Sequence, residues 1–277
     1  MGGASKAATI IIGRGSAAVP VELNLSDPED LWAESCALAM LTVGIVGFGA
    51  TVREDGVRSD DVGNGWHGMS GVGGGRAVLY GYDVDYSETR HQVPPVDLLA
   101  GGPAWLPWEW LAKMMRQEHI VQYVYWWDGS TWARTDYPDG MRDGGGGCTG
   151  RDDQVEDAFL AWGDNSKEAL DAFENLIRAA RARGVDETVV EALLRHLDPG
   201  SFDIEPTEPF NAEAMLAVAE HAALTPGSVR PELAPGQGEP AGRRVHLIDH
   251  PGQWAPFEES FLTDGVPPHL CWSPPSS

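Results

Sequence analysis

The chain has 277 residues, of which 42 are acidic and 19 are basic, so its formal net charge is −23. This charge argues against a nucleic acid as the partner, because phosphate contacts require lysine and arginine side chains that displace counterions. It disfavours binding to an anionic membrane surface for the same reason. Three explanations of the acidity remain: the protein binds a basic protein, it binds a cation, or the charge serves only to keep it soluble.

The composition indicates a folded protein of a reducing compartment. Hydrophobic residues make up 42% of the chain and 11 residues are tryptophan, unlike the composition of disordered chains. The length suits one large domain or two smaller ones. Three cysteines, far apart in the sequence, cannot form a disulfide framework or a zinc knuckle. We therefore expect a bacterial cytoplasmic protein without a secretory leader or a membrane span.

The beginning of the chain predicts short strands, a helix and a further strand. Residues 8–24 contain β-branched runs that suit one or two short strands. Ser26 precedes Pro28 and Glu29, a helix start with Ser26 as the capping side chain and Glu29 completing a capping box. Residues 35–52 carry no charge but contain glycines, so we interpret them as a core helix that continues into a core strand.

The motif Gly44-Ile-Val-Gly47-Phe-Gly49 begins like the glycine-rich turn of a dinucleotide-binding unit. The pattern then fails, because Val52 stands where the third glycine is needed and Arg53 follows where a helix should begin. We interpret the segment as a buried strand whose small residues allow close packing.

Residues 53–76 are predicted to form a long mobile loop. Seven of the 13 residues from Gly63 to Gly75 are glycine, and such a density is typical of loops. A strand is then expected over residues 77–82 and a helix over residues 105–117.

A β-hairpin is predicted around Asp128 and Gly129. Runs of β-branched and aromatic residues over 120–127 and 130–134 flank this dipeptide, which tolerates the positive φ angles of a type I′ turn. Residues 126–132 resemble the Trp-Trp-Asp-Gly-x-x-Trp hairpin of a short domain common in actinobacterial proteins. The resemblance implies the hairpin and no particular function.

The hairpin carries aromatic side chains on both faces, because alternate residues of a strand point to opposite sides. This pattern indicates either burial on both sides or one exposed recognition face. Under the second alternative the candidate binding residues are Tyr123, Tyr125, Trp127 and Trp132.

Helices dominate the remainder of the chain. A first helix is expected from residue 151, Asn165 caps a second, a third spans residues 187–196, and Asn211 caps a fourth. Residues 225–243 are rich in proline and glycine and suit a linker or a segment that wraps the surface.

Together these elements predict an α+β fold with a mixed or antiparallel sheet and helices packed on one of its faces. We expect residues 1–150 to contain the sheet and the glycine-rich loop 53–76. Residues 151–223 are expected to form a C-terminal helical layer, and residues 224–277 a linker and tail rich in proline and glycine.

Two groups of acidic and histidine side chains are candidates for chemistry. Asp83 and Asp85 end a predicted strand and point to one side of an extended chain, so both carboxylates could bind one hard cation. His91 could act as a general base or a further ligand, which makes Asp83, Asp85 and His91 the candidate catalytic set. A solvated loop is the other interpretation.

The second group contains His246, Asp249 and His250 in a predicted strand. Residues 246 and 250 share a face of that strand and could both bind a metal. The candidate metal ligands of the chain are therefore Asp83, Asp85, His246 and His250. No cofactor is strongly implied.

The leading functional hypothesis is an acidic cytoplasmic module that binds a basic protein, similar to immunity or antitoxin-type proteins. Residues 151–277 carry 23 acidic and 9 basic side chains, a net charge of −14, and no nucleophile elbow or zinc-protease helix is present. The sequence thus favours binding over catalysis. One alternative is a metal-dependent hydrolase or lyase built from the two Asp/His groups. Another is a small-molecule binding protein with an aromatic pocket.

Overall fold

The computed structural model describes residues 19–45, 48–61, 65–89, 92, 96–118, 121–138, 140–145, 159, 163, 166–198 and 210–240. These ranges contain the strands β1 (Val21–Leu23), β2 (Phe48–Arg53), β3 (Gly56–Asp61), β4 (Gly65–Val72), β5 (Arg76–Asp83), β6 (Tyr123–Trp127), β7 (Trp132–Arg134) and β8 (Glu232–Leu233). They also contain the helices α1 (Pro28–Leu41), α2 (Trp108–Glu118), α4 (Lys167–Arg181), α5 (Glu187–Leu194) and α6 (Ala212–His221).

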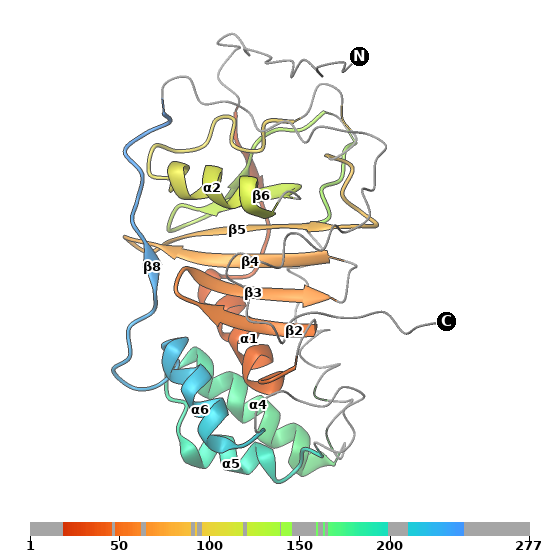
Figure 1. Ribbon diagram of the computed structural model, residues 1–277, viewed down its shortest axis with the longest axis vertical. Helices are drawn as coiled ribbons and strands as arrows, with labels where there is room; N and C mark the ends of the chain where they lie inside the picture. The colour runs from red at the N-terminus through yellow and green to blue at the C-terminus, as the bar shows by residue number, and fades with distance from the viewer. Residues whose placement is uncertain are drawn as a thin grey trace, which may run out of the picture.

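The strands form one sheet in the order β1-β7-β6-β5-β4-β3-β2, with every neighbouring pair antiparallel. From β2 to β7 the strands are neighbours in chain order, the arrangement expected when successive strands pair with each other. Figure 1 shows this sheet with α4, α5 and α6 gathered at one end of the molecule. The α+β class, the antiparallel sheet and the C-terminal helical layer are therefore confirmed.

Each face of the sheet has its own core. On one face, side chains such as Met69 and Leu79 pack with α1, and α1 packs in turn against α4 and α6. On the other face, side chains such as Tyr80 and Trp126 pack with α2. The helical layer thus lies on the α1 side, and α2 adds a cover on the second face, because the central strands are apolar on both sides.

The α1 helix begins one residue later than the capping pattern predicts. Asp27, and not Ser26, is the capping residue, and its carboxylate accepts a hydrogen bond from the Glu29 N–H at 2.8 Å. The carbonyl of Ser26 instead accepts a hydrogen bond from the indole N–H of Trp132 at 2.8 Å. Ser26 therefore connects the helix start to the sheet.

The segment after α1 enters β2 with the close packing that its small residues predict, but β2 is the edge strand of the sheet and its Thr51 and Arg53 are exposed, so it is not a buried strand. The Thr42 hydroxyl donates to the Leu38 carbonyl at 2.8 Å and accepts from the Ala50 N–H at 3.1 Å. Gly49 has a φ of +94°, and a Cβ at this position would lie 2.3 Å from Thr42 Oγ1. A glycine is needed here because the end of the helix and the strand are in contact.

The prediction of a mobile loop over residues 53–76 is wrong. β3 and β4 occupy most of this segment and lie inside the sheet. Two of the glycines mark close approaches: a Cβ at Gly68 would lie 2.6 Å from the Tyr80 ring, and one at Gly65 would lie 2.6 Å from the Tyr82 carbonyl oxygen. At Gly65 and Gly68 a glycine is therefore needed because neighbouring rings and backbone leave no room for a side chain.

The predicted hairpin is confirmed as β6 and β7, but its turn lies one residue later. The Asp128 N–H donates to the Thr131 carbonyl at 3.3 Å, which places Gly129 and Ser130 at the centre. Gly129 has a φ of +107°. The Asp128 carboxylate accepts hydrogen bonds from the N–H groups of Ser130 and Thr131 at 2.8 and 3.0 Å. Asp128 therefore holds the turn from its first position.

The C-terminal helices begin at capping side chains. Ser166, one residue after the predicted Asn165, caps α4 by accepting from the Ala169 N–H at 3.0 Å. Asn211 caps α6 as predicted, by accepting from the Ala214 N–H at 2.9 Å. The helix expected from residue 151 lies outside the described residues apart from 159 and 163. Within the described ranges, no helix is both long enough and apolar enough to cross a membrane.

Residues 225–240, which we call the strap, wrap the surface. β8 pairs in parallel with Gly71 and Val72 of β4, beyond Met69, where the pairing of β3 with β4 ends. Further on, the Gly236 N–H donates to the Trp105 carbonyl at 2.8 Å. Figure 1 shows the strap running from α6 past the sheet toward α2. Of the two expectations for this segment, a surface-wrapping segment is the one observed.

Arg230 anchors the strap to α1. Its Nη1 lies 2.7 Å from Glu29 Oε1, and its guanidinium carbon lies 5.3 Å from the centre of the Trp32 ring. Arg183 binds the other oxygen of Glu29 at 2.8 Å. Burial alone would raise the pKa of Glu29, but the two arginines outweigh it and hold this pKa below its usual value.

Candidate functional site

Asp83 and Asp85 lie at the end of β5 and in the turn that follows it. β5 ends at Asp83, and the Asp83 carboxylate accepts hydrogen bonds from the N–H groups of Asp85 and Tyr86, both at 2.9 Å. Asp83 therefore stabilises its own turn, while Asp85 is exposed. Within the described ranges, no group of three or more His, Cys, Asp or Glu side chains is arranged to hold a metal ion. His91, His246, Asp249 and His250 lie outside the described residues.

The aromatic side chains of the hairpin lie mainly in the core. Tyr123, Tyr125 and Trp132 are buried and Trp127 is half-buried. The two tyrosine rings are 5.1 Å apart and the two tryptophan rings 5.7 Å apart, measured between centroids. On the opposite face Trp126 is buried as well. Of the two interpretations of this hairpin, burial on both sides is the one observed.

A buried polar network surrounds Asp143. Its Oδ1 accepts hydrogen bonds from the Tyr125 hydroxyl at 2.6 Å and from the Gly145 N–H at 3.1 Å. Its Oδ2 lies 3.6 Å from Arg134 Nε, and the Arg134 guanidinium stacks on the Tyr137 ring at 3.9 Å. Burial, followed by the Asp143 charge, raises the pKa of Tyr125 far above its usual value. This network connects Asp143 and Gly145 to β6 and β7.

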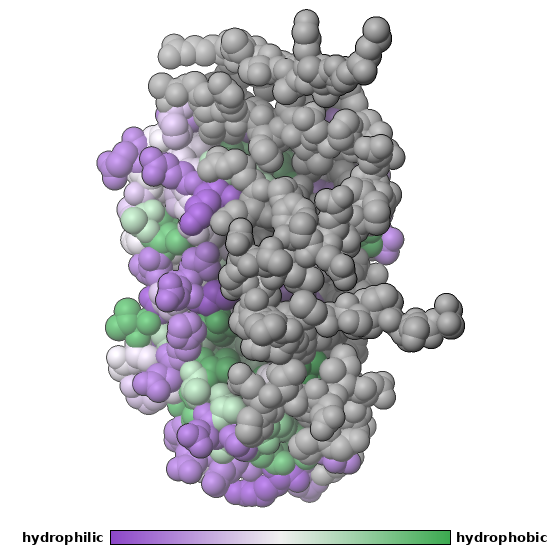
Figure 2. All heavy atoms as spheres, in the orientation of Figure 1, coloured by the Kyte–Doolittle hydropathy of each residue, from purple (hydrophilic) through white to green (hydrophobic). Residues whose placement is uncertain are grey.

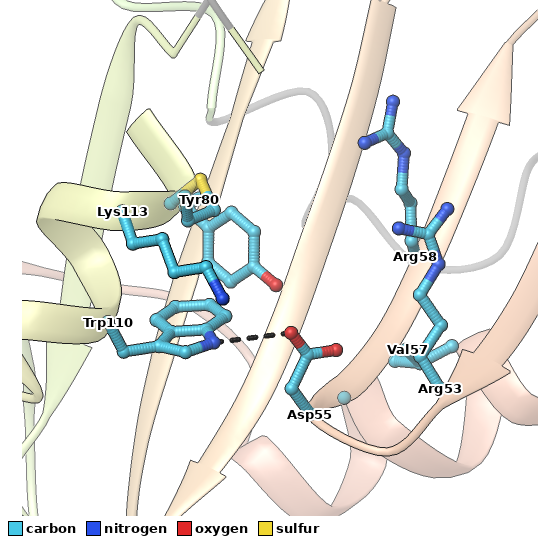
Figure 3. Close-up of a pocket in the computed structure, with 9 residues that line it drawn as sticks. Arg53, Asp55, Val57, Arg58, Tyr80, Trp110 and Lys113 are labelled. Carbon is cyan, nitrogen blue, oxygen red and sulfur yellow. Dashed lines mark hydrogen bonds between the residues drawn. The ribbon is translucent and has the colours of Figure 1, made fainter. Parts of the chain in front are cut away.

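A pocket of about 140 Å³ lies between α2 and the sheet. The end of β2, the following turn and the start of β3 supply one side, and β5 and α2 supply the other (Figure 3). Its lining combines charge with aromatic rings: Arg53, Asp55, Gly56, Val57, Arg58, Tyr80, Trp110, Lys113 and Met114. Among the pockets lined by described residues, it is the one that combines positively charged, negatively charged and aromatic side chains. We therefore take it as the candidate functional site.

The sheet creates the floor of this pocket through one cross-strand row. Arg58 pairs with Gly68, and Gly68 pairs with Tyr80, so the three residues project from the same face. Because Gly68 has no side chain, the Tyr80 ring lies over it. Trp110 of α2 then meets Tyr80 edge to face, with 5.3 Å between ring centroids.

Hydrogen bonds hold the polar groups of the pocket. The Trp110 indole N–H donates to Asp55 Oδ2 at 3.2 Å, as Figure 3 shows. The hydroxyls of Tyr80 and Ser70 lie 3.3 Å apart. Burial raises the pKa of Tyr80 to about 12, the hydrogen bond to Ser70 opposes this rise, and the charge of Asp55 adds to it. Tyr80 is therefore a neutral phenol near pH 7 and can donate a proton in a hydrogen bond.

The cations of the pocket fall into two kinds. Arg58 is bound by Asp60, with 3.1 Å between Nη2 and Oδ1, and stacks on the Trp66 ring at 4.1 Å. Arg53 and Lys113 are exposed at the mouth and form no ion pair or hydrogen bond with any residue of the described ranges. These two groups are therefore available to a negatively charged ligand.

Sequence reasoning missed this pocket for an identifiable reason. The density of glycine predicts a loop for Arg53, Asp55 and Arg58, although Asp55-Gly56 between two polar-apolar alternating runs is itself a hairpin signal. Tyr80 and Lys113 come from distant parts of the chain, and no local pattern links them to the hairpin.

A second, shallower groove of about 410 Å³ lies between the end of α1, β2 and α6. Alanine and valine side chains dominate its wall, and His221 is its one titratable group among the described residues. It offers few polar groups to orient a ligand.

Comparison of the chain with protein-family models, with curated proteins and with solved structures gave no match.

Proposed function

We propose that this protein binds a small molecule that carries a carboxylate, in the pocket between α2 and the β2–β3 turn. The observation that carries the proposal is the pair of cations, Arg53 and Lys113, without partners in the described ranges. Acidic side chains outnumber basic ones by 42 to 19 in this chain, so two cations that line one pocket and form no ion pair within the described ranges are unusual. A ligand carboxylate would accept charge-assisted hydrogen bonds from Arg53 and Lys113.

The surroundings of the two cations suit a ligand as well. Tyr80 supplies a neutral hydroxyl, and Trp110 supplies an apolar wall whose N–H is already held by Asp55. Pockets that bind small molecules typically combine apolar and aromatic walls with a few polar groups that orient the ligand. This proposal is the small-molecule alternative of the sequence analysis, with a different aromatic set: Tyr80 and Trp110 in place of the hairpin residues.

Titration calorimetry with acetate, propionate, lactate, glycine and alanine tests the proposal. We expect at least one of these carboxylates to bind, and Arg53→Gln and Lys113→Gln each to weaken that binding about tenfold or more, since a hydrogen bond to a charged group contributes about 1.5–3 kcal/mol. Arg195→Gln removes an exposed arginine outside the pocket and should bind like the unmodified protein. Absence of binding across the whole panel would refute the proposal, as would unchanged affinity in both pocket variants.

A second candidate function is binding of a basic protein through the C-terminal helices. Arg181 and Arg183 turn toward α1, where they pair with Asp30, Glu34 and Glu29. The outward surface is therefore left with an excess of exposed carboxylates: Glu168, Asp171, Glu174, Asp186, Glu187, Glu191, Glu213 and Glu220. On the side shown in Figure 2, hydrophilic residues predominate around these helices, with hydrophobic residues exposed among them. An acidic surface of this kind attracts basic partners and makes the association salt-sensitive.

Affinity capture from a bacterial lysate at low and at high salt tests this second function. We expect a basic protein to be retained at low salt and released at high salt, and the double variant Glu174→Gln/Glu191→Gln to retain less of it. The double variant Glu22→Gln/Asp85→Asn has the same charge change away from the helices and is the matched control. A retained protein that is not basic, or equal retention by both variants, contradicts the assignment.

A further inference from the structure

We infer that the ligand of the pocket is a small zwitterion, an amino acid of about the size of alanine, rather than a simple anion. The inference rests on the proposed function and adds a second recognition element, a site for an ammonium group beside the site for the carboxylate. Each element is supplied by different residues of the same pocket.

Asp55 is the ammonium-binding element. It is the one carboxylate among the residues that line the pocket, and it faces the aromatic side chains in Figure 3. Its Oδ2 accepts the Trp110 N–H at 3.2 Å, whereas its Oδ1 has no hydrogen-bond partner in the described part of the chain. A simple anion would be repelled by this carboxylate at close range, while an ammonium group would supply the missing donors.

The aromatic walls favour the same positively charged group. Tyr80 and Trp110 meet at 72° with 5.3 Å between their ring centroids, which presents the face of one ring beside the edge of the other. Ring faces attract ammonium groups through the cation–π interaction. The carboxylate end of the ligand would then lie toward Arg53 and Lys113.

The size of the pocket sets the size of the ligand. A dry protein cavity of about 150 Å³ holds a molecule as large as benzene, with about six heavy atoms. The pocket measures about 140 Å³, so a ligand of about six heavy atoms fits, and alanine has that number. Larger side chains would have to extend into solvent at the mouth.

The charge of the whole protein argues in the same direction. With a formal net charge of −23, the molecule repels free anions at long range and lowers their local concentration. A zwitterion carries no net charge and is not repelled. Inside the pocket, each of its two charged groups would meet an opposite charge of the protein.

Calorimetry with alanine, propionate and alaninamide distinguishes the two recognition elements. Propionate lacks the ammonium group and alaninamide lacks the carboxylate. We expect alanine to bind and both analogues to bind at least tenfold more weakly. Propionate binding as tightly as alanine would overturn the zwitterion inference and leave the proposed function standing. Alaninamide binding as tightly as alanine would overturn both, and failure of all three to bind would overturn the zwitterion inference.

Replacement of Asp55 tests the ammonium site directly. We expect Asp55→Asn to weaken alanine binding about tenfold and to leave propionate binding equal or tighter, because the Asn carbonyl still accepts the Trp110 N–H. Glu54→Gln removes the same charge from the neighbouring position of the same turn and should leave both affinities unchanged. Equal loss for alanine and propionate in Asp55→Asn, with a native circular dichroism spectrum, would show that Asp55 does not recognise ammonium.

Discussion

Replacing Asp143 with alanine is expected to lower the free energy of unfolding by about 3–5 kcal/mol, the loss typical when one partner of a buried charged pair is removed. The change leaves the Tyr125 hydroxyl, bound to Asp143 at 2.6 Å, and the Arg134 guanidinium, 3.6 Å from it, without their carboxylate. For a chain of this size the midpoint of thermal unfolding should fall by roughly 6–15 °C. Thermal or denaturant unfolding followed by circular dichroism measures the effect.

A matched control separates this effect from the loss of any surface carboxylate. Asp85 is exposed and forms no ion pair within the described ranges, so Asp85→Ala should change stability by no more than about 0.5 kcal/mol. The double variant Asp143→Ala/Tyr125→Phe should recover part of the loss, because it no longer buries an unsatisfied hydroxyl. A loss below about 1 kcal/mol in Asp143→Ala would contradict the structural role of the network.

The substitution Gly81→Ala is expected to cost about 3 kcal/mol, at the upper end of the range for overpacking in a core. A Cβ at this position would lie 2.2 Å from the Trp66 carbonyl oxygen and 2.6 Å from the Tyr123 hydroxyl oxygen. The first contact is with backbone, so β4 and β5 would have to separate. Chemical denaturation of the purified variant gives the loss directly.

Gly73→Ala is the control for this prediction. Its Cβ would lie 3.4 Å from Pro235 Cδ, an ordinary contact distance, so stability should stay within about 0.5 kcal/mol of the unmodified protein. Similar losses in Gly81→Ala and Gly73→Ala would mean that glycine acts in this sheet through backbone entropy, and not through the close approach of neighbouring strands.

Part of the fold could be predicted because it depends on neighbours in the chain. Asn211 caps α6 through the N–H three residues ahead, and the aromatic runs on either side of Asp128 pair through a short turn. Errors of one residue at Ser26 and Asn165 arose where two adjacent residues were both good caps, so that the local pattern alone did not choose between them.

The candidate site could not be predicted, because its residues meet only through the sheet. Position 68 must be glycine because the Tyr80 ring of the adjacent strand covers it. The Trp110 indole N–H donates to Asp55, which lies 55 positions away in the sequence. A count of glycines cannot distinguish a flexible segment from one that is crowded by its neighbours. The spacing of Asp83 and Asp85 likewise does not reveal that the Asp83 carboxylate accepts hydrogen bonds from the backbone of its own turn.

The sequence by itself determined the α+β class, the helical C-terminal half, the hairpin and the strong negative charge, because periodicity, capping and composition are properties of short segments or of the whole chain. Only the tertiary structure decided that residues 53–76 lie within the sheet, that the hairpin rings are in the core, and that Arg53, Lys113 and Asp55 face one pocket with Tyr80 and Trp110. These features depend on strand register and on the packing of α2, which bring together residues far apart in the chain.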